Sequence, residues 1–470
     1  SAADATLQVR YVAAPGTSGA GGPAIARSLP AGRELYLPDV IAFLRANGVT
    51  LADDKSAKLG TLFVTFGGVA DASLVFAGSR TTTPNADAGV GGAYGTFAPA
   101  TRSGSGTGGD AWVYGLRQDA AYRSNLAVVH SPGGSSSATS AGPISVEVQV
   151  FDGGTGRAAG SPIAFTLQPG EFHQVNEVLS AARPGLANGY ARVRRTSGSD
   201  RFLAYGVVND GGSSGGGTSD GSFIASGGSD GLVPIVLDLP GATHYETELT
   251  LTNGSASSST VTLRYTPSPV FGEKGGGVVT TTLEPGVQLA ATDAIGFLRG
   301  LGLAIPADGT KQGGTLLVTG AFALARTFSP NPNTSIGGTY GLAYPAIGAS
   351  ERARSSAVVF GLRHDADVRS NLAIADARVG DASPVQYAIE VYDTVSGSSQ
   401  PVQTLTRTLA GGQWTQVDSI LVGAGVTRGW VRVKVASGTS DFVAYGVVND
   451  GAAVGSRTSD GSYLPMVVEP

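Results

Sequence analysis

Hydrophobic and polar residues alternate along many short segments of this chain. Clear examples begin at Thr6 (TLQVRYV), Ile144 (ISVEVQVFD), Thr260 (TVTLRYT) and Tyr387 (YAIEVYD). A period of two places every second side chain on the same face of a strand, so each segment predicts a strand with one buried face. Gly, Ser and Pro separate these segments, which is typical of turns between antiparallel strands.

A duplication relates the two halves of the chain. VYGLRQDAAYRSNLAVV, which begins at Val113, returns 246 residues later as VFGLRHDADVRSNLAIA at Val359, and AYGVVNDG occurs at both Ala204 and Ala444. A weaker repeat divides each half, because Leu-x-x-Gly occurs once per unit, ending at Gly32, Gly170, Gly286 and Gly412. The predicted units are 1–108 (A1), 109–229 (B1), 230–350 (A2) and 351–470 (B2), in the order A-B-A-B.

A short polar residue follows each Leu-x-x-Gly and precedes a brief apolar run. Asp39, Asn176, Asp293 and Asp418 hold this position, which predicts an N-cap and one short helix in every unit. The predicted fold class is therefore all-β, with four tandem immunoglobulin-like antiparallel β-sandwich units that each contain one short helix.

The strand pattern and the segments LxPG, RSNL and YGVVND resemble the tandem immunoglobulin-like or fibronectin-type sandwich repeats of secreted bacterial surface proteins. The resemblance spans the whole chain, although its motifs have low specificity. It implies a secreted, extracellular or cell-surface location in a bacterium. It transfers no catalytic residue, because such repeats share no common active site.

Composition excludes several classes of protein. The 71 Gly residues lack the every-third-residue period of collagen, and the chain has no Cys for disulfides or thiolate metal sites. The net charge of -5, without a run of Lys or Arg, argues against a nucleic-acid partner. No apolar stretch approaches the length of a membrane span, so none is expected.

The first unit begins late in the pattern of its repeat. Leu7, Val9 and Tyr11 align with Val261, Leu263 and Tyr265 at an offset of 254, but A2 has a further segment before Val261, VPIVLDLPGATHYETELTLTNGS, with at least one more strand. Three explanations remain open: residues upstream of Ser1 were removed or lie outside the sequence, A1 closes through altered packing, or a strand from another copy or another surface protein fills the gap. The last explanation predicts head-to-tail assembly at a groove lined by Leu7, Val9 and Tyr11.

Four aspartates are the best candidates for binding a metal ion. Asp210 and Asp220 lie in VVNDGGSSGGGTSDGS, and Asp450 and Asp460 lie in the corresponding VVNDGAAVGSRTSDGS. Converging carboxylates bind calcium, but Asn-Asp-Gly and Ser-Asp-Gly also form turns in which the side chain bonds its own backbone. We favour turns, and we expect no other cofactor. His130, His173, His244 and His364 do not recur at equivalent positions, so a shared zinc site is not expected.

Two further clusters have a structural and a binding interpretation. Asp119 with Arg123, and Asp365 with Arg369, are expected to pair locally at the unit junctions, and we favour a role in junction geometry over a binding surface. Exposed tryptophans form sugar-binding platforms, but Trp112, Trp414 and Trp430 stand in strand-like segments, which favours packing.

The sequence as a whole favours a non-enzymatic extracellular structural or adhesive protein, such as a surface spacer or a filament component. Repeated cores suit reach and display, whereas catalysis generally needs one concave site of convergent groups. The alternatives are an adhesin module that binds glycans, for which Trp414 is the first residue to test, and a non-catalytic region of a larger secreted enzyme.

Overall fold

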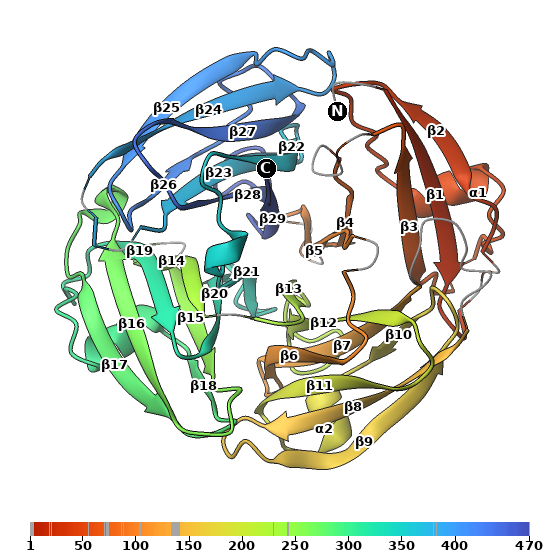
Figure 1. Ribbon diagram of the computed structural model, residues 1–470, viewed down its shortest axis with the longest axis horizontal. Coiled ribbons are helices and arrows are strands. Elements are labelled where there is room, and N and C mark those ends of the chain that lie inside the picture. The colour runs from red at the N-terminus through yellow and green to blue at the C-terminus, as the bar shows by residue number, and fades with distance from the viewer. Residues whose placement is uncertain are drawn as a thin grey trace.

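The computed structural model describes residues 4–469 except 18, 20, 55, 70, 72–74, 86, 88, 103–104, 133–141, 229, 242–243, 379 and 382. The described residues form several antiparallel sheets and three short α helices, so the predicted all-β class is correct. Figure 1 shows the chain running once around a ring, in which A1, B1, A2 and B2 follow one another and B2 returns to A1. None of the helices in the described part of the chain has the length and apolar character needed to cross a membrane.

B1 and B2 share one arrangement of strands. The elements of B1 are β6 (Asp110–Arg117), β7 (Tyr122–Ser131), β8 (Ile144–Asp152), β9 (Ala158–Leu167), β10 (Phe172–Val175), α2 (Val178–Ala182), β11 (Asn188–Ser197), β12 (Arg201–Asp210) and β13 (Gly221–Ala225). Those of B2 are β22 (Ser356–Arg363), β23 (Val368–Asp376), β24 (Val385–Asp393), β25 (Gln403–Leu409), β26 (Trp414–Val417), β27 (Arg428–Ser437), β28 (Phe442–Asp450) and β29 (Gly461–Val468).

The last strand of each B repeat differs. In B2, β29 pairs with both β28 and β22 and joins all strands in the order β25-β24-β27-β22-β29-β28-β23-β26. In B1, β13 pairs only with β12, which leaves two sheets, β10-β7-β12-β13 and β6-β11-β8-β9. The cause is local, because Gly227 and Gly228 adopt positive φ values of 89° and 143° and end the strand early.

A2 is a continuous sheet that folds over on itself. Its elements are β14 (Gly231–Leu239), β15 (Tyr245–Thr252), β16 (Ser259–Pro267), β17 (Gly277–Leu283), β18 (Gln288–Ala291), α3 (Ala294–Gly300), β19 (Gln312–Thr319), β20 (Phe322–Pro330) and β21 (Thr339–Pro345), with short 3-10 turns at Pro269–Phe271 and Ala349–Glu351. The order is β17-β16-β19-β14-β15-β20-β21, with β18 also on β15. The register of β14 on β19 shifts between Val233 and Val236, around Pro234, which has no N–H to donate.

A1 contains fewer strands than A2. Its elements are β1 (Ala5–Ala13), β2 (Ile25–Leu29), α1 (Val40–Ala46), β3 (Gly60–Gly67), β4 (Gly78–Pro84) and β5 (Ala93–Pro99). They form a sheet β2-β1-β3 and a separate pair β4-β5. These strands match β16, β17, β19, β20 and β21, so the described part of A1 has no counterpart of β14 or β15.

The predicted helix caps are correct in the A repeats only. Asp39 accepts a hydrogen bond from Ala42 N at 2.9 Å, and Asp293 accepts one from Gly296 N at 2.8 Å. In B1 the helix begins one residue later than predicted, after Glu177, without a side-chain cap. The prediction of a helix after Asp418 is wrong, because this segment, which contains two glycines, forms successive turns.

Buried apolar clusters follow the repeats. B1, B2, A2 and A1 each contain one, and the A1 cluster is the smallest. A fifth cluster joins A2 to B2 through residues such as Ile235 and Trp414. At the ring centre β5, β13, β21 and β29 converge, each contacting the strands of the two neighbouring repeats (Figure 1). We call these four strands the hub.

Candidate functional site

The four Leu-x-x-Gly turns lie at the four junctions of the ring. Each terminal glycine has a positive φ, between 69° and 83°. A Cβ at any of them would come within 2.7–3.0 Å of the preceding repeat, and the atom that Gly32 of A1 would meet is the carbonyl oxygen of Gly397 in B2. Only glycine fits such a close approach with this backbone conformation. The motif therefore shapes junctions, including the one that closes the ring.

Asp210 and Asp450 join each B repeat to the A repeat that follows it around the ring. Asp210 Oδ1 accepts from Thr339 N at 2.9 Å, and its Oδ2 accepts from Thr218 N at 2.6 Å. Asp450 Oδ1 accepts from Ala93 N at 3.1 Å, and its Oδ2 accepts from Thr458 N at 3.0 Å. The two junctions are thus built alike, and the shorter β13 does not open the one between B1 and A2.

Asp220 and Asp460 make a second matched pair of junction contacts. Asp220 Oδ2 accepts from Gly341 N at 2.8 Å, and Asp460 Oδ2 accepts from Gly95 N at 2.9 Å. Each side chain is almost fully buried, and its other oxygen has no hydrogen-bond partner among the described residues. Burial raises the pKa of Asp220 to about 6, and burial with the nearby Asp220 carboxylate raises the pKa of Asp460 well above its ordinary value.

The donors around Asp210 and Asp450 argue against calcium at these two carboxylates. Asp210 and Asp450 accept from backbone N–H groups and threonine hydroxyls, whereas a calcium ion needs oxygen atoms that present lone pairs. The cluster of described residues with metal-ligand spacing lies elsewhere, at Asp238, His244 and Glu246. There His244 Nε2 lies 2.9 Å from Asp238 Oδ1 and 3.3 Å from Glu246 Oε1. These distances are those of ion pairs between the imidazole in its charged form and two carboxylates.

The RSNL segment organises its own repeat, but the expected pairing of Asp119 with Arg123 is wrong. Arg123 Nη1 donates to the carbonyl oxygens of Asp210, Gly211 and Ser213, within 3.0 Å of each, and so holds the loop after β12. Asp119 instead forms an ion pair with Arg117 at 3.5 Å. The expected Asp365–Arg369 pair is wrong for the same reason.

In B2, Arg369 Nη1 donates to the carbonyl oxygens of Asp450, Gly451 and Ala453. Asp365 pairs with Arg363 at 2.7 Å. In both B repeats, one guanidinium nitrogen therefore binds three carbonyl oxygens at and after the end of the strand and fixes the shape of the loop.

The tryptophans pack against other aromatic residues. Trp414 is buried, and its Nε1 donates to Tyr445 Oη at 3.0 Å. Trp430 stacks on Tyr392 with ring centroids 3.8 Å apart, and Trp112 stacks on Tyr114. These contacts agree with the packing interpretation, most clearly for Trp414, which is buried.

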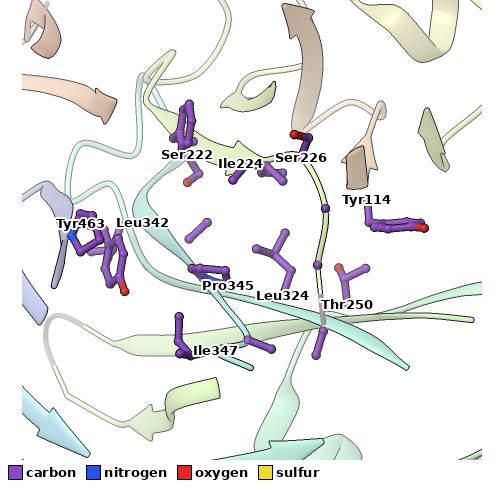
Figure 2. A pocket seen from close by; sticks show the side chains of 18 of the residues that line it. Tyr114, Ser222, Ile224, Ser226, Thr250, Leu324, Leu342, Pro345, Ile347 and Tyr463 are labelled. Atoms are coloured by element: carbon purple, nitrogen blue, oxygen red, sulfur yellow. The ribbon is translucent and has the colours of Figure 1, made fainter. Parts of the chain in front are cut away.

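A cavity of about 320 Å³ lies beside the hub. Its lining comes from the four hub strands and from residues such as Tyr114, Thr250 and Phe322. Figure 2 shows mainly apolar side chains around it, including Leu324, Leu342, Pro345 and Ile347. The cavity thus offers apolar space at the centre of the ring rather than a convergence of polar groups.

The second candidate site is the place in A1 where A2 has β14 and β15. In A2, β14 pairs along β19, and β15 pairs along β20. In A1, β3 pairs only with β1 and β4 only with β5, so one edge of each strand is unpaired among the described residues. We call the space between these two edges the A1 slot.

Burial agrees with an open slot. Leu316 and Val318 of β19 are fully buried, whereas their counterparts Leu62 and Val64 of β3 are half-buried. Residues 34–37, which correspond to β18, form no strand, because β18 needs β15 as its partner. Leu35 and Leu59 of A1 are 40% and 50% exposed.

Leu7, Val9 and Tyr11 do not line an unpaired edge. They lie on β1, which pairs with β2 on one side and β3 on the other, and all three are buried in the A1 core. An added strand therefore has no edge of β1 to join. The predicted groove at Leu7, Val9 and Tyr11 is therefore wrong, because an alignment of the repeats cannot tell which strands of A2 the additional segment contacts.

A scan of the sequence against protein-family models gives no match, and a search of curated proteins gives none either.

Proposed function

We propose that this chain is a non-enzymatic structural or adhesive protein that assembles by β-strand addition at the A1 slot. The observation that carries the proposal is the pair of unpaired edges on β3 and β4, at the position where A2 holds β14 and β15. Unpaired edges beside exposed leucines form a template for another strand. The proposed partner is a strand-forming segment of another protein on the same cell surface.

The roles of the candidate residues support a structural function. The aspartates, the RSNL arginines and the Leu-x-x-Gly turns connect loops and neighbouring repeats. Their polar atoms are directed at protein groups, which suits holding a defined shape. The finer description of the repeats as immunoglobulin-like sandwiches, and a secreted bacterial location, rest on the resemblance of the repeated segments.

Closure into a ring limits the length that a single chain can span. B2 returns to A1, as in the hydrogen bond from Ala93 N to Asp450, so a single chain does not extend as a row of four repeats. In a filament, further length would come from the partner protein that adds its strand at the A1 slot.

The test uses a hairpin that the chain itself provides. A peptide of residues 231–254, which contains β14 and β15, is fused to a soluble carrier and titrated into the full chain. We expect saturable one-to-one binding by calorimetry, because A2 keeps its own hairpin and A1 offers one slot. A scrambled peptide is the control for composition, and the variant Leu62→Asp should abolish binding. Failure of the native-sequence peptide to bind at any accessible concentration contradicts the proposal.

A further inference from the structure

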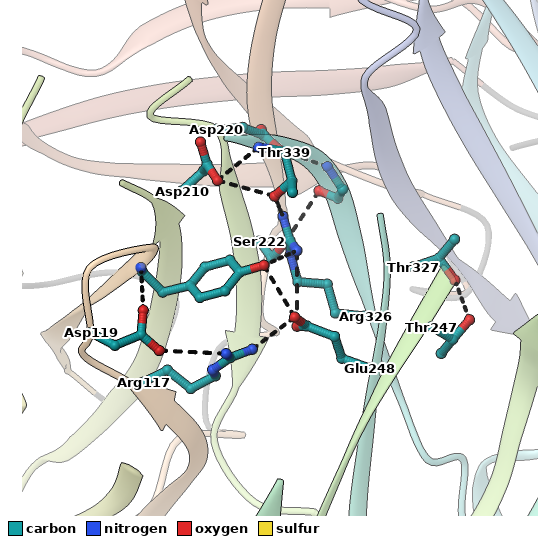
Figure 3. A network of polar contacts seen from close by, with 12 residues as sticks. Arg117, Asp119, Asp210, Asp220, Ser222, Thr247, Glu248, Arg326, Thr327 and Thr339 are labelled. Atoms are coloured by element: carbon teal, nitrogen blue, oxygen red, sulfur yellow. Dashed lines mark hydrogen bonds and ion pairs between the residues drawn. The ribbon is translucent and has the colours of Figure 1, made fainter. Parts of the chain in front are cut away.

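A buried glutamate of A2 makes two contacts across the junction with B1 and a third within A2. Glu248 of β15 is 9% exposed, and its Oε1 lies 2.8 Å from Arg117 Nη1 of B1. Tyr122 Oη donates to the same oxygen at 3.1 Å, and Arg326 Nη1 lies 3.9 Å from Oε2 (Figure 3). One carboxylate thus neutralises two arginines that lie on different repeats.

Both arginines recur at the junction of B2 and A1. Arg363 corresponds to Arg117, and Arg80 corresponds to Arg326, each at an offset of 246. Their side chains are 21% and 19% exposed. The strand that would bring a counterpart of Glu248 is one of the two without a counterpart in the described part of A1, so no equivalent carboxylate of that strand meets these arginines there.

Two donors of these arginines are left without acceptors. Nε of Arg363 and Nη2 of Arg80 are buried and have no hydrogen-bond partner among the described residues. In A2 the matching Arg326 Nη2 donates to Thr339 Oγ1 at 3.1 Å, and the counterpart of Thr339 in A1 is Ala93, which has no side-chain acceptor. Arg80 Nη2 lies 3.6 Å from Asp460 Oδ2, beyond hydrogen-bonding distance. A buried donor without an acceptor is costly, so this position favours an incoming acceptor.

Other acids near these arginines do not replace Glu248. Asp365 pairs with Arg363 as Asp119 pairs with Arg117, and Asp460 corresponds to Asp220. Glu34 also lies near Arg363, but its negative charge is offset by Arg428. Arg428 stands where B1 has the neutral Asn188, so the pair adds no net charge. Relative to the complete junction, the A1 slot therefore has one negative charge fewer.

We propose that the occupant of the A1 slot is a β-hairpin of the β14–β15 type from outside these 470 residues, and that a carboxylate on its second strand binds Arg80 and Arg363. This inference rests on the proposed strand addition and names its partner. In A2, Thr327 Oγ1 lies 3.1 Å from Thr247 Oγ1. The counterpart of Thr327 in A1 is Thr81, which is exposed. In the proposed complex, Thr81 makes the same contact with a hydroxyl side chain of the hairpin, next in sequence to the carboxylate.

A second copy of the chain is not the donor. The hairpin of this type among its described residues, β14–β15, is already paired in its own A2, so donating it would create the same gap there. The carboxylate also selects the register of the incoming strand, because a slip of one residue would turn it to the opposite face.

The experiment compares peptides rather than folded variants. The 231–254 peptide is titrated into the full chain at neutral pH beside two single-charge variants, Glu248→Gln and Glu246→Gln. We expect Glu248→Gln to weaken binding about tenfold or more, and Glu246→Gln to change it by about twofold or less. With Arg363→Gln in the chain, the difference between the native peptide and Glu248→Gln should shrink, as in a double-mutant cycle.

The outcomes separate this inference from the function on which it rests. If no peptide binds, strand addition itself fails. If all three peptides bind equally, the slot accepts hairpins but the role of the carboxylate is refuted. If the chain alone forms dimers in sedimentation experiments and the peptide dissociates them, the occupant is a second copy, which overturns the assignment to an outside hairpin.

Discussion

Asp450 accepts a hydrogen bond from the backbone N–H of Ala93 at 3.1 Å, across 357 residues of chain. Asp210 makes the equivalent contact with Thr339 at 2.9 Å, between repeats that follow one another in sequence. The Asp210–Thr339 contact therefore strengthens a junction between two repeats that the chain already connects. The Asp450–Ala93 contact closes the ring.

This difference predicts unequal effects of matched substitutions. Asp450→Ala and Asp210→Ala should each cost on the order of 3 kcal/mol in the free energy of unfolding, because each leaves buried N–H donors without an acceptor. Only Asp450→Ala should also increase the radius of gyration in small-angle scattering, since no covalent link holds B2 against A1. Equal scattering curves for the two variants would show that the ring does not depend on this contact.

The buried pair Asp220 and Asp460 predicts an unusual pH dependence. The pKa of Asp220 is raised to about 6 from an ordinary value of 3.8, so the folded state binds its proton more tightly than the unfolded state. Its contribution to stability is then fully present below about pH 4 and is lost as pH rises through 6. The difference in unfolding free energy between the wild type and Asp220→Asn, measured by urea denaturation, should fall across this window. A difference that rises with pH would refute the assignment.

The A1 slot predicts different costs for equivalent core substitutions. Leu316→Ala should destabilise the protein by about 2–5 kcal/mol, because Leu316 is fully buried under β14. Leu62→Ala should cost clearly less in the free chain, since Leu62 is half-buried. Denaturation in urea measures both. Equal costs would mean that A1 is already complete.

Trp414 distinguishes packing from glycan binding. Trp414→Ala should cost about 3–5 kcal/mol, because it removes a buried side chain from the A2–B2 cluster together with its hydrogen bond to Tyr445. Trp414→Phe should recover most of this stability. If instead Trp414→Ala leaves stability unchanged and abolishes binding on a glycan array, the sugar-binding interpretation is correct.

Much of the architecture could be predicted because period-two alternation is a local signal. The segments at Thr6, Ile144, Thr260 and Tyr387 all lie in strands, and the caps of α1 and α3 follow from a single aspartate each. The ring could not be predicted, because it depends on contacts such as Asp450 with Ala93 that leave no periodic pattern.

The site was located only in part for a related reason. The gap in A1 follows from aligning repeats, but its position beside β3 and β4 depends on β14 crossing between the halves of the A2 sheet. Glu248 is one of two glutamates in a strand-like segment. Its importance comes from Arg117 and Arg326, which lie far from it in sequence.

Hydrogen exchange of the backbone amides of β3 and β4 tests the central claim most directly. In the free chain, the amides of Gly60–Gly67 and Gly78–Pro84 that do not pair with β1 or β5 should exchange rapidly, while those of β19 and β20 stay protected. Addition of the 231–254 peptide should slow exchange in both A1 strands. Amides in β3 and β4 that are as protected as those of β19 and β20 in the free chain would contradict the open slot.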